Sequence, residues 1–230
     1  MPRMKATTTN AAFETIRKMI QHYQLQPNQV VSDFELAETL GISRTPVRDA
    51  INRLISYGLL EKEGSRTIVK PIQMDDVYEI FQVREAIETM AVKLIILNGG
   101  LTSEQLEQID DNHHQLSDCI SEDRFDDNFK LDAFFHLSLI SCAKNSRLID
   151  IHERMTIQGE RLRWLTRLTP ERYKRTLLEH QEIINAICQK DVESCVKFVS
   201  DHMHNSVENY ETILHSSQWN KILQTIGQLR

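Results

Sequence analysis

Apolar residues recur at helical spacing along most of the chain, and this periodicity is the strongest constraint on its fold. From Met74 onward only helical periods occur, with breaks at 98–100, 144–145 and 169–170. We therefore expect a bundle of antiparallel helices over residues 74–98, 102–121, 123–142, 146–167, 170–189 and 192–215. Glycine and proline are scarce, at 7 and 5 of 230 residues, which agrees with a mainly α protein.

The first 72 residues follow a different pattern. Apolar spacing predicts helices over 8–24, 32–41 and 43–58, with a tight turn before the last of them. The stretch "LLEKEGSRTIVKPI" then predicts two short strands around a turn at Gly64 and Ser65. We expect two domains, residues 1–72 and 73–230.

Charge is distributed unevenly between these two parts. Residues 1–72 carry 10 Lys and Arg against 7 Asp and Glu, whereas residues 73–230 carry 17 against 26. The mildly basic charge of residues 1–72 suggests that only this part of the chain binds a polyanion. No apolar run approaches the roughly 20 residues needed to cross a bilayer. The start "MPRMKATTTN" lacks the apolar core of a signal peptide, so we expect a cytoplasmic protein without a membrane partner.

The segment "ISRTPVRDAI" predicts a helix whose polar end reads DNA. Val47 and Ile51 share its apolar face, whereas its polar and cationic residues lie in the first turns. In a helix-turn-helix the N-terminal residues of the second helix meet base edges, where arginine pairs with guanine and hydroxyls bind phosphates. The candidate DNA-binding residues are Ser43, Arg44, Thr45 and Arg48, with Lys62 and Arg66 on the hairpin. An ordinary amphipathic helix with a charged start fits the same pattern.

The longer segment "ELAETLGISRTPVRDAINRLISYGLL" resembles the winged helix-turn-helix of GntR-family transcription regulators. The resemblance covers about residues 10–70 and implies DNA contacts by Arg44, Thr45 and Arg48, with Ser43 beside them. The chain departs from the family pattern at Asn28, which replaces a usual glycine, at Phe34, which replaces a polar or basic residue, and at Thr67 in the wing.

Four polar residues interrupt the apolar seams of three predicted helices. Asp132 and His136 lie one turn apart on one seam, and His180 and His202 interrupt two later seams. Because a buried unpaired carboxylate is costly, such groups are paired or bind metal. Three imidazoles and one carboxylate suit Zn²⁺ or Ni²⁺. For any single histidine a hydrogen-bonded core residue is the commoner explanation, and spacing alone does not show that the four converge.

Three further residues are candidates for binding a small ligand. Arg84 falls in the apolar stripe of the helix predicted over 74–98, where its guanidinium would suit a carboxylate. An internal ion pair with Glu88, one turn further on, explains the same position. Asn145 and Gln158 are weaker candidates, and Asn145 is also placed to cap the following helix.

Residues 75–215 resemble the ligand-binding domain of the FadR/VanR branch of GntR regulators. The resemblance is carried by "VREAIE", "DAFFHLSLISCAKN", "LLEHQEIINAICQKD" and "SDHM". In metal-binding members of that branch the ligands correspond to Asp132, His136, His180 and His202 of this chain. The resemblance further implies an all-helical effector domain, a small organic acid bound beside the metal, and dimers.

These observations favour a homodimeric transcription regulator that binds double-stranded operator DNA and is controlled by a small carboxylate at a metal site. One alternative is a metal-dependent hydrolase or lyase, for which Glu88 and Glu179 are the only candidate acid-base groups. The other is a regulator whose metal is purely structural. The sequence leaves open which acid, metal and operator are bound, and whether binding represses or activates.

Overall fold

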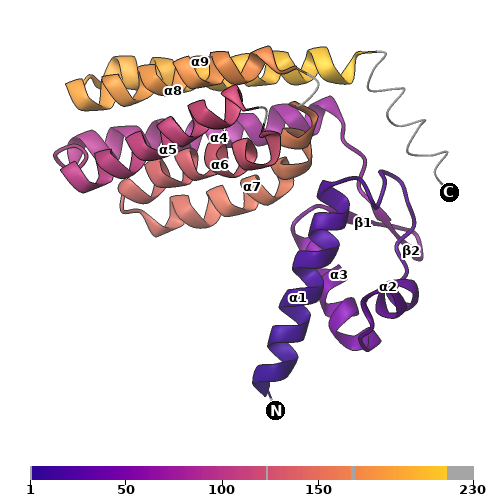
Figure 1. Cartoon of the computed structure of the whole chain (residues 1–230). Helices are drawn as coiled ribbons and strands as arrows, with labels where there is room; N and C mark the ends of the chain where they lie inside the picture. Colours follow the sequence, from indigo (N-terminus) through magenta and orange to yellow (C-terminus); the bar gives the residue numbers. More distant parts are fainter. Residues whose placement is uncertain (1, 123, 167–168, 217–230) are drawn as a thin grey trace. The chain divides into compact units, whose positions relative to one another are not determined.

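The computed structural model describes residues 2–122, 124–166 and 169–216, which fall into two compact units (Figure 1). Residues 2–73 belong to one unit and residues 74–216 to the other. The change of unit lies between Gln73 and Met74, next to the predicted boundary. We call the first unit the head and the second the helical unit.

The head contains three helices followed by a hairpin. Its elements are α1 (Pro2–Gln21), α2 (Asp33–Leu40), α3 (Arg44–Ser56), β1 (Leu60–Glu63) and β2 (Arg66–Val69). The prediction of a helix over 8–24 was wrong at both ends, since α1 begins at Pro2 and ends at Gln21. Its start was missed because apolar periodicity detects only turns with an apolar stripe, and the first residues are mostly polar. At its end, Tyr23 takes a left-handed φ of 57° and the N–H of Leu25 bonds back to Met19.

A tight turn joins α2 to α3. The Ser32 hydroxyl caps α2 by accepting from the N–H of Glu35, and Gly41 ends it with a left-handed φ of 65°. Ser43 occupies the cap position of α3, but its side chain makes no capping bond. Its hydroxyl stands exposed at the end of the helix instead.

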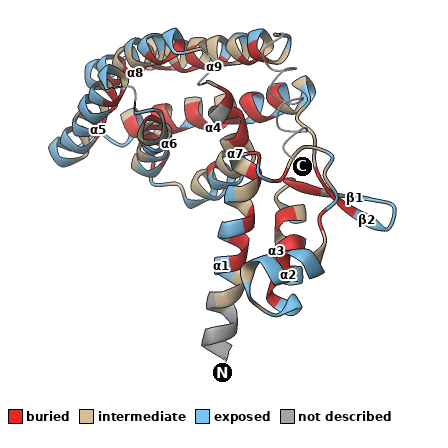
Figure 2. Ribbon diagram, turned by 45° about the vertical axis from the view of Figure 1, so that its right-hand side comes forward, coloured by how far each residue is buried: buried red, intermediate tan, exposed pale blue. Residues whose placement is uncertain are grey.

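The core of the head lies between α1 and α3. Phe13, Ile16 and Leu54 are at most 1% exposed, and the Arg53 guanidinium lies 3.9 Å from the centre of the Phe13 ring. Figure 2 shows the buried faces of both helices in red.

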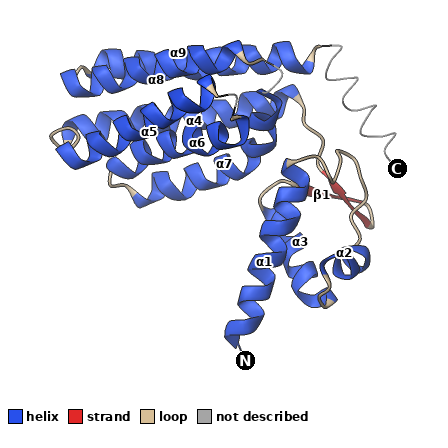
Figure 3. Ribbon diagram, viewed as in Figure 1, coloured by secondary structure: helices blue, strands red, loops and turns tan. Residues whose placement is uncertain are grey.

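The predicted hairpin is present. β1 and β2 pair antiparallel from Leu60 opposite Val69 to Glu63 opposite Arg66, and Gly64 forms the turn with φ 60° (Figure 3). A bridge between Val30 and Ile68 ties the segment before α2 to β2. The described part of the head is therefore a winged helix-turn-helix.

The helical unit contains every helix that the periodicity predicts. The expected start at 123 and the expected end at 167 lie outside the described residues, and the other ends fall within one residue of those expected. The helices are α4 (Met74–Leu97), α5 (Ser103–Ser121), α6 (Phe125–Cys142), α7 (Ser146–Leu165), α8 (Glu171–Gln189) and α9 (Val192–Leu214). Consecutive helices pack against each other at α5–α6, α6–α7 and α8–α9, as short connections require. α4 packs against α6, α7 and α9, which places it at the centre of the bundle.

Local signals in the sequence set the helix ends of this unit. Thr102 and Gln105 form a reciprocal capping box at the start of α5. Gly99 and Gly100, with φ values of 104° and 98°, separate α4 from α5. No helix among the described residues is both long enough and apolar enough to span a membrane.

Replacing Leu139 with alanine tests the packing of the bundle. Leu139 lies on α6 with 1% of its surface exposed, so Leu139→Ala leaves a cavity and should lower the free energy of unfolding by about 2–5 kcal/mol. Urea unfolding followed by circular dichroism measures the change. The matched control is Leu97→Ala, at a residue 77% exposed on α4, which should cost less than about 0.5 kcal/mol. Equal losses in both variants would contradict the packing described.

Candidate metal centre and DNA-reading surface

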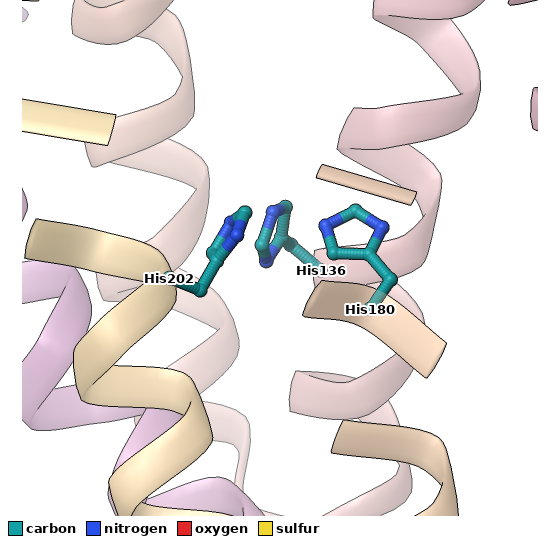
Figure 4. Close-up of side chains that lie close together, drawn as sticks. All are labelled: His136, His180 and His202. Carbon is teal, nitrogen blue, oxygen red and sulfur yellow. The ribbon is translucent and has the colours of Figure 1, made fainter. Parts of the chain in front are cut away.

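Three histidines from three different helices converge inside the helical unit. His136 on α6, His180 on α8 and His202 on α9 are 1%, 0% and 3% exposed. One ligand nitrogen from each lies within 4.8 Å of the others, and Figure 4 shows the three rings gathered together. Since a histidine nitrogen lies about 2.0–2.1 Å from a bound Zn²⁺, the cluster is close to the size that one ion bridges.

The carboxylate of Asp132 joins this cluster. Its Oδ1 lies 3.9 Å from Nε2 of His136, one turn away on α6, and 3.8 Å from Nε2 of His180. The Asp132 side chain is 21% exposed, so the site is not sealed from solvent on this side. Asp132 thus lies close to two of the three histidines, whereas the group whose ligand atoms all lie within 4.8 Å of one another consists of His136, His180 and His202.

Two buried carboxylates orient two of the imidazoles. Glu88 Oε2 lies 2.7 Å from His136 Nδ1, and Glu179 Oε2 lies 2.7 Å from His202 Nδ1. An ionised carboxylate only accepts hydrogen bonds, so each Nδ1 must donate. Burial lowers the pKa of His136, so this ring is neutral and its Nε2 keeps a lone pair. A carboxylate behind an imidazole is the arrangement that fixes the tautomer of metal-binding histidines.

Both carboxyl groups are held in the ionised form. Burial by itself would raise the pKa of Glu88, but the charge of Arg84 and the hydrogen bond from His136 outweigh it and hold that pKa below its usual range. Burial also opposes ionisation of Glu179, where hydrogen bonds from His202 and Arg172 prevail and lower the pKa. Both groups are therefore acceptors at neutral pH.

His180 has no hydrogen-bond partner for either ring nitrogen, although both are buried. Burial, together with the neighbouring His202 and His136, lowers its pKa well below the ordinary value, so the ring is neutral. Its ring stacks on Phe135 with 3.8 Å between centres. Leaving buried polar atoms unsatisfied costs free energy, and a metal ion at the centre of the cluster would satisfy one of them. The donor set therefore fits a metal.

A cavity of about 50 Å³ adjoins the cluster. Asp132, His136 and His202 line it together with two buried arginines, Arg84 and Arg172. Hydroxyl and amide groups complete the wall, among them Thr166, Tyr173, Thr176, Ser206 and Asn209. The cavity thus combines the candidate metal ligands with cationic and hydrogen-bonding groups.

The three predicted ligand-binding residues differ in their placement. Arg84 lines the cavity, but its Nε donates to Glu88 Oε1 at 3.0 Å, which is the ion pair that the sequence left open. Asn145 and Gln158 are not among the residues that line it. The side chain of Asn145 instead accepts from the N–H of Arg147 and caps α7.

Two buried groups near the site were not among the predicted site residues. Arg172 is 7% exposed, and its Nη2 donates to Glu179 Oε2 at 2.8 Å while its Nη1 has no hydrogen-bond partner. His152 is 1% exposed and lies 4.0 Å from Glu88 Oε1. The sequence could have identified His152 as an inward-facing residue, because it lies on α7 in an apolar stripe with i, i+4, i+7 spacing. Arg172 stands in a polar stretch that offers no such signal.

The predicted DNA-binding residues lie on the head in two groups. Ser43, Arg44, Thr45 and Arg48 are all exposed at the start of α3. On the hairpin, Lys62 Nζ donates to Thr67 Oγ1 at 2.8 Å, and Arg66 is exposed beside the turn. The geometry agrees with a reading end on α3 because its apolar face, from Pro46 to Leu54, is buried.

Comparison with known proteins identifies both units. Residues 8–69 match the model of the bacterial regulatory proteins of the gntR family, and residues 79–205 match that of the FCD domain. The HTH-type transcriptional repressor RspR of Escherichia coli is 26% identical over 209 residues, covering 90% of this chain and 91% of the relative. An uncharacterised HTH-type transcriptional regulator of Bacillus subtilis, YdhC, is 24% identical over 210 residues, covering 90% and 93%.

Solved structures support the same fold. E. coli McbR/YncC superposes with a TM-score of 0.75 at 21% identity and covers 89% of this chain and 97% of its own. A GntR regulator from Rhodococcus sp. RHA1 gives a TM-score of 0.70 at 20% identity, with 89% and 97% covered. The chain belongs to the gntR family of bacterial transcriptional regulators, with a helix-turn-helix head and an FCD domain as its helical unit.

Proposed function

We propose that this DNA-binding regulator changes its operator affinity when a small organic acid binds beside a divalent transition metal in the helical unit. The observation that carries the proposal is the convergence of three buried histidines and Asp132, with carboxylates behind two of the imidazoles. We further propose that it acts as a homodimer in the cytoplasm, because the head reads a half-site and two heads read a two-fold symmetric operator.

The donor set determines which metal the site would take. Imidazole nitrogens suit zinc, nickel and copper, whereas magnesium and calcium prefer oxygen ligands. Zinc or nickel is therefore the ion we assign, held by Asp132, His136, His180 and His202. When bound, it supplies a positive charge that attracts an anion.

The charge balance of the site favours an acid as the effector. Glu88 compensates Arg84, and Glu179 contacts Arg172, so these pairs contribute no net charge. A divalent ion beside a single Asp132 leaves the site net positive, and an anionic ligand would neutralise it. A cavity of about 50 Å³ corresponds to only a few water-sized groups, which limits the ligand to a compact acid.

Two buried arginines could hold such an acid. Nε and Nη2 of Arg84 lie within 3.0 Å of Glu88 Oε1, but Nη2 makes no hydrogen bond. Arg172 contacts Glu179 and Ser206 through Nη2 alone, and its Nη1 has no hydrogen-bond partner. A ligand carboxylate would satisfy this buried donor.

The alternative of a metal-dependent hydrolase or lyase is not supported. Glu88 contacts His136 and Arg84, and Glu179 contacts His202 and Arg172, so neither candidate acid-base group is available to a substrate. The gntR family consists of transcription regulators, and a DNA-reading head serves no catalytic purpose. A purely structural metal remains the competing account, and titration with acids separates the two.

The first test of the proposal is metal content. The double variant His180→Ala/His202→Ala removes two of the four assigned ligands and should abolish stoichiometric Zn²⁺ or Ni²⁺ in protein purified without chelator. Native mass spectrometry with metal analysis measures it, and circular dichroism confirms that the bundle is folded. The matched control is His204→Ala, a side chain 70% exposed on the same helix, which should keep the metal. Full metal content in the double variant would refute the assignment.

The second test is the response to acids. A panel of small mono-, di- and hydroxycarboxylic acids is titrated by calorimetry into metal-loaded and metal-stripped protein, followed by operator binding with each acid that binds. Coupling between two sites is typically about 1–3 kcal/mol, so an effector should shift operator affinity by roughly 5–150-fold. Arg172→Gln should weaken acid binding while leaving the metal in place. An acid that binds tightly but leaves operator affinity unchanged would reduce the helical unit to a binding module.

The third test concerns the reading helix. Arg44→Ala and Arg48→Ala should each cost about 1–3 kcal/mol of operator binding if the lost contact is a bidentate pair with guanine. Binding to a duplex selected from random DNA measures the loss by fluorescence anisotropy. Lys130→Ala, which removes a cation 76% exposed in the helical unit, is the control and should bind as the parent does. Parent-like binding by both arginine variants would mean that another surface reads the operator.

A further inference from the structure

The carboxylate of Asp33 binds both candidate base-reading arginines in the head. Arg44 Nη2 donates to Asp33 Oδ1 at 2.8 Å, and Arg48 donates to Oδ2 through Nε at 3.1 Å and through Nη2 at 3.0 Å. The three residues come from both helices of the motif, because Asp33 is the first residue of α2 and the arginines lie on the first turns of α3. One acid thus fixes the directions of two side chains.

Asp33 is itself held firmly in this position. It follows the N-cap residue Ser32 and lies in the first turn of α2, where a negative charge is favoured by the helix dipole. Hydrogen bonds from Arg44 and then Arg48 lower the pKa of its carboxyl group, so it is ionised at neutral pH. Its side chain is 22% exposed, compared with 55% and 62% for the two arginines.

The contacts leave donors of both arginines available for DNA. A guanidinium carries five N–H donors. Arg48 uses the edge formed by Nε and Nη2, so the edge formed by Nη1 and Nη2 can still meet O6 and N7 of a guanine. Arg44 uses only Nη2. Both side chains can therefore remain bonded to Asp33 while they read a base.

The same carboxylate disfavours binding to DNA of the wrong sequence. Without base contacts, affinity comes from cations that bind phosphates. Two arginines paired with one carboxylate attract phosphates less strongly than two unpaired arginines would, because the carboxylate cancels part of their charge. A phosphate that approaches them is also repelled by Asp33.

We propose that Asp33 is a specificity-determining residue that positions Arg44 and Arg48 for base reading and weakens their binding to nonspecific DNA. It acts through the arginines and contacts no base in this account. The inference rests on the proposed base-reading role of the two arginines. It is independent of the metal and of the acid.

The test compares two duplexes for the variant Asp33→Asn. One is an operator selected from random DNA, and the other is a scrambled duplex of equal length and composition, both titrated at two salt concentrations. We expect tighter binding to the scrambled duplex, weaker binding to the operator, and a specificity ratio about tenfold lower, since a well-held bidentate arginine provides discrimination of that order.

Two further variants separate positioning from a general change in charge. Glu38→Gln makes the same charge change at an exposed residue of the same helix and should leave the ratio unchanged. Asp33→Glu keeps the carboxylate, which can still reach both arginines, and should restore most of the ratio. Circular dichroism shows that each variant is folded.

The outcomes distinguish this inference from the proposed reading role. If Arg44→Ala and Arg48→Ala lose operator binding while Asp33→Asn keeps the parent ratio, the arginines read DNA without help from Asp33 and the inference is wrong. It is also wrong if Glu38→Gln lowers the ratio as much as Asp33→Asn does, or if Asp33→Glu behaves like Asp33→Asn. If the arginine variants bind as the parent does, the reading role itself fails.

Discussion

A carboxylate buried at the centre of the helical unit, that of Glu88, must be compensated, and the packing of the surrounding helices follows from that requirement. Removing an ion from water costs several kcal/mol unless other groups pair with it. Arg84 on the same helix supplies the cation, His136 on α6 supplies a hydrogen bond, and His152 on α7 lies 4.0 Å away. α4, α6 and α7 therefore have to meet at this point, and their meeting turns Nε2 of His136 toward the histidine cluster.

The sequence predicted the helices well because each one buries a face or carries its own end signals. The bundle helices appear as apolar stripes, and Thr102 and Gln105 mark the start of α5 by local hydrogen bonds. α1 was predicted too short for the complementary reason, since its first turns are mostly polar. Local periodicity thus detects apolar stripes and caps, and it does not detect a helix whose sequence shows neither.

The candidate site was predictable only in part, because its residues meet through contacts between distant parts of the chain. Each seam showed that a histidine faces inward, but only the tertiary structure shows that the rings meet. The alternative of an Arg84–Glu88 pair was open because the two residues are four apart on one helix. The roles of Arg172 and Asp33 were not predicted, since Arg172 meets Ser206 from another helix and Asp33 meets Arg48 from 15 residues away.

Arginine–carboxylate pairs occur in both units, and their different burial gives them different uses. The Arg84–Glu88 pair is 6% and 2% exposed, so breaking it would leave an uncompensated buried charge. The pair is therefore a permanent part of the structure that fixes an imidazole. The side chains of the arginines bound to Asp33 are more than half exposed. Exposed ion pairs contribute about 0–1 kcal/mol to the free energy of unfolding. An interaction of that size can orient a side chain without preventing it from binding DNA, which is what a reading residue requires.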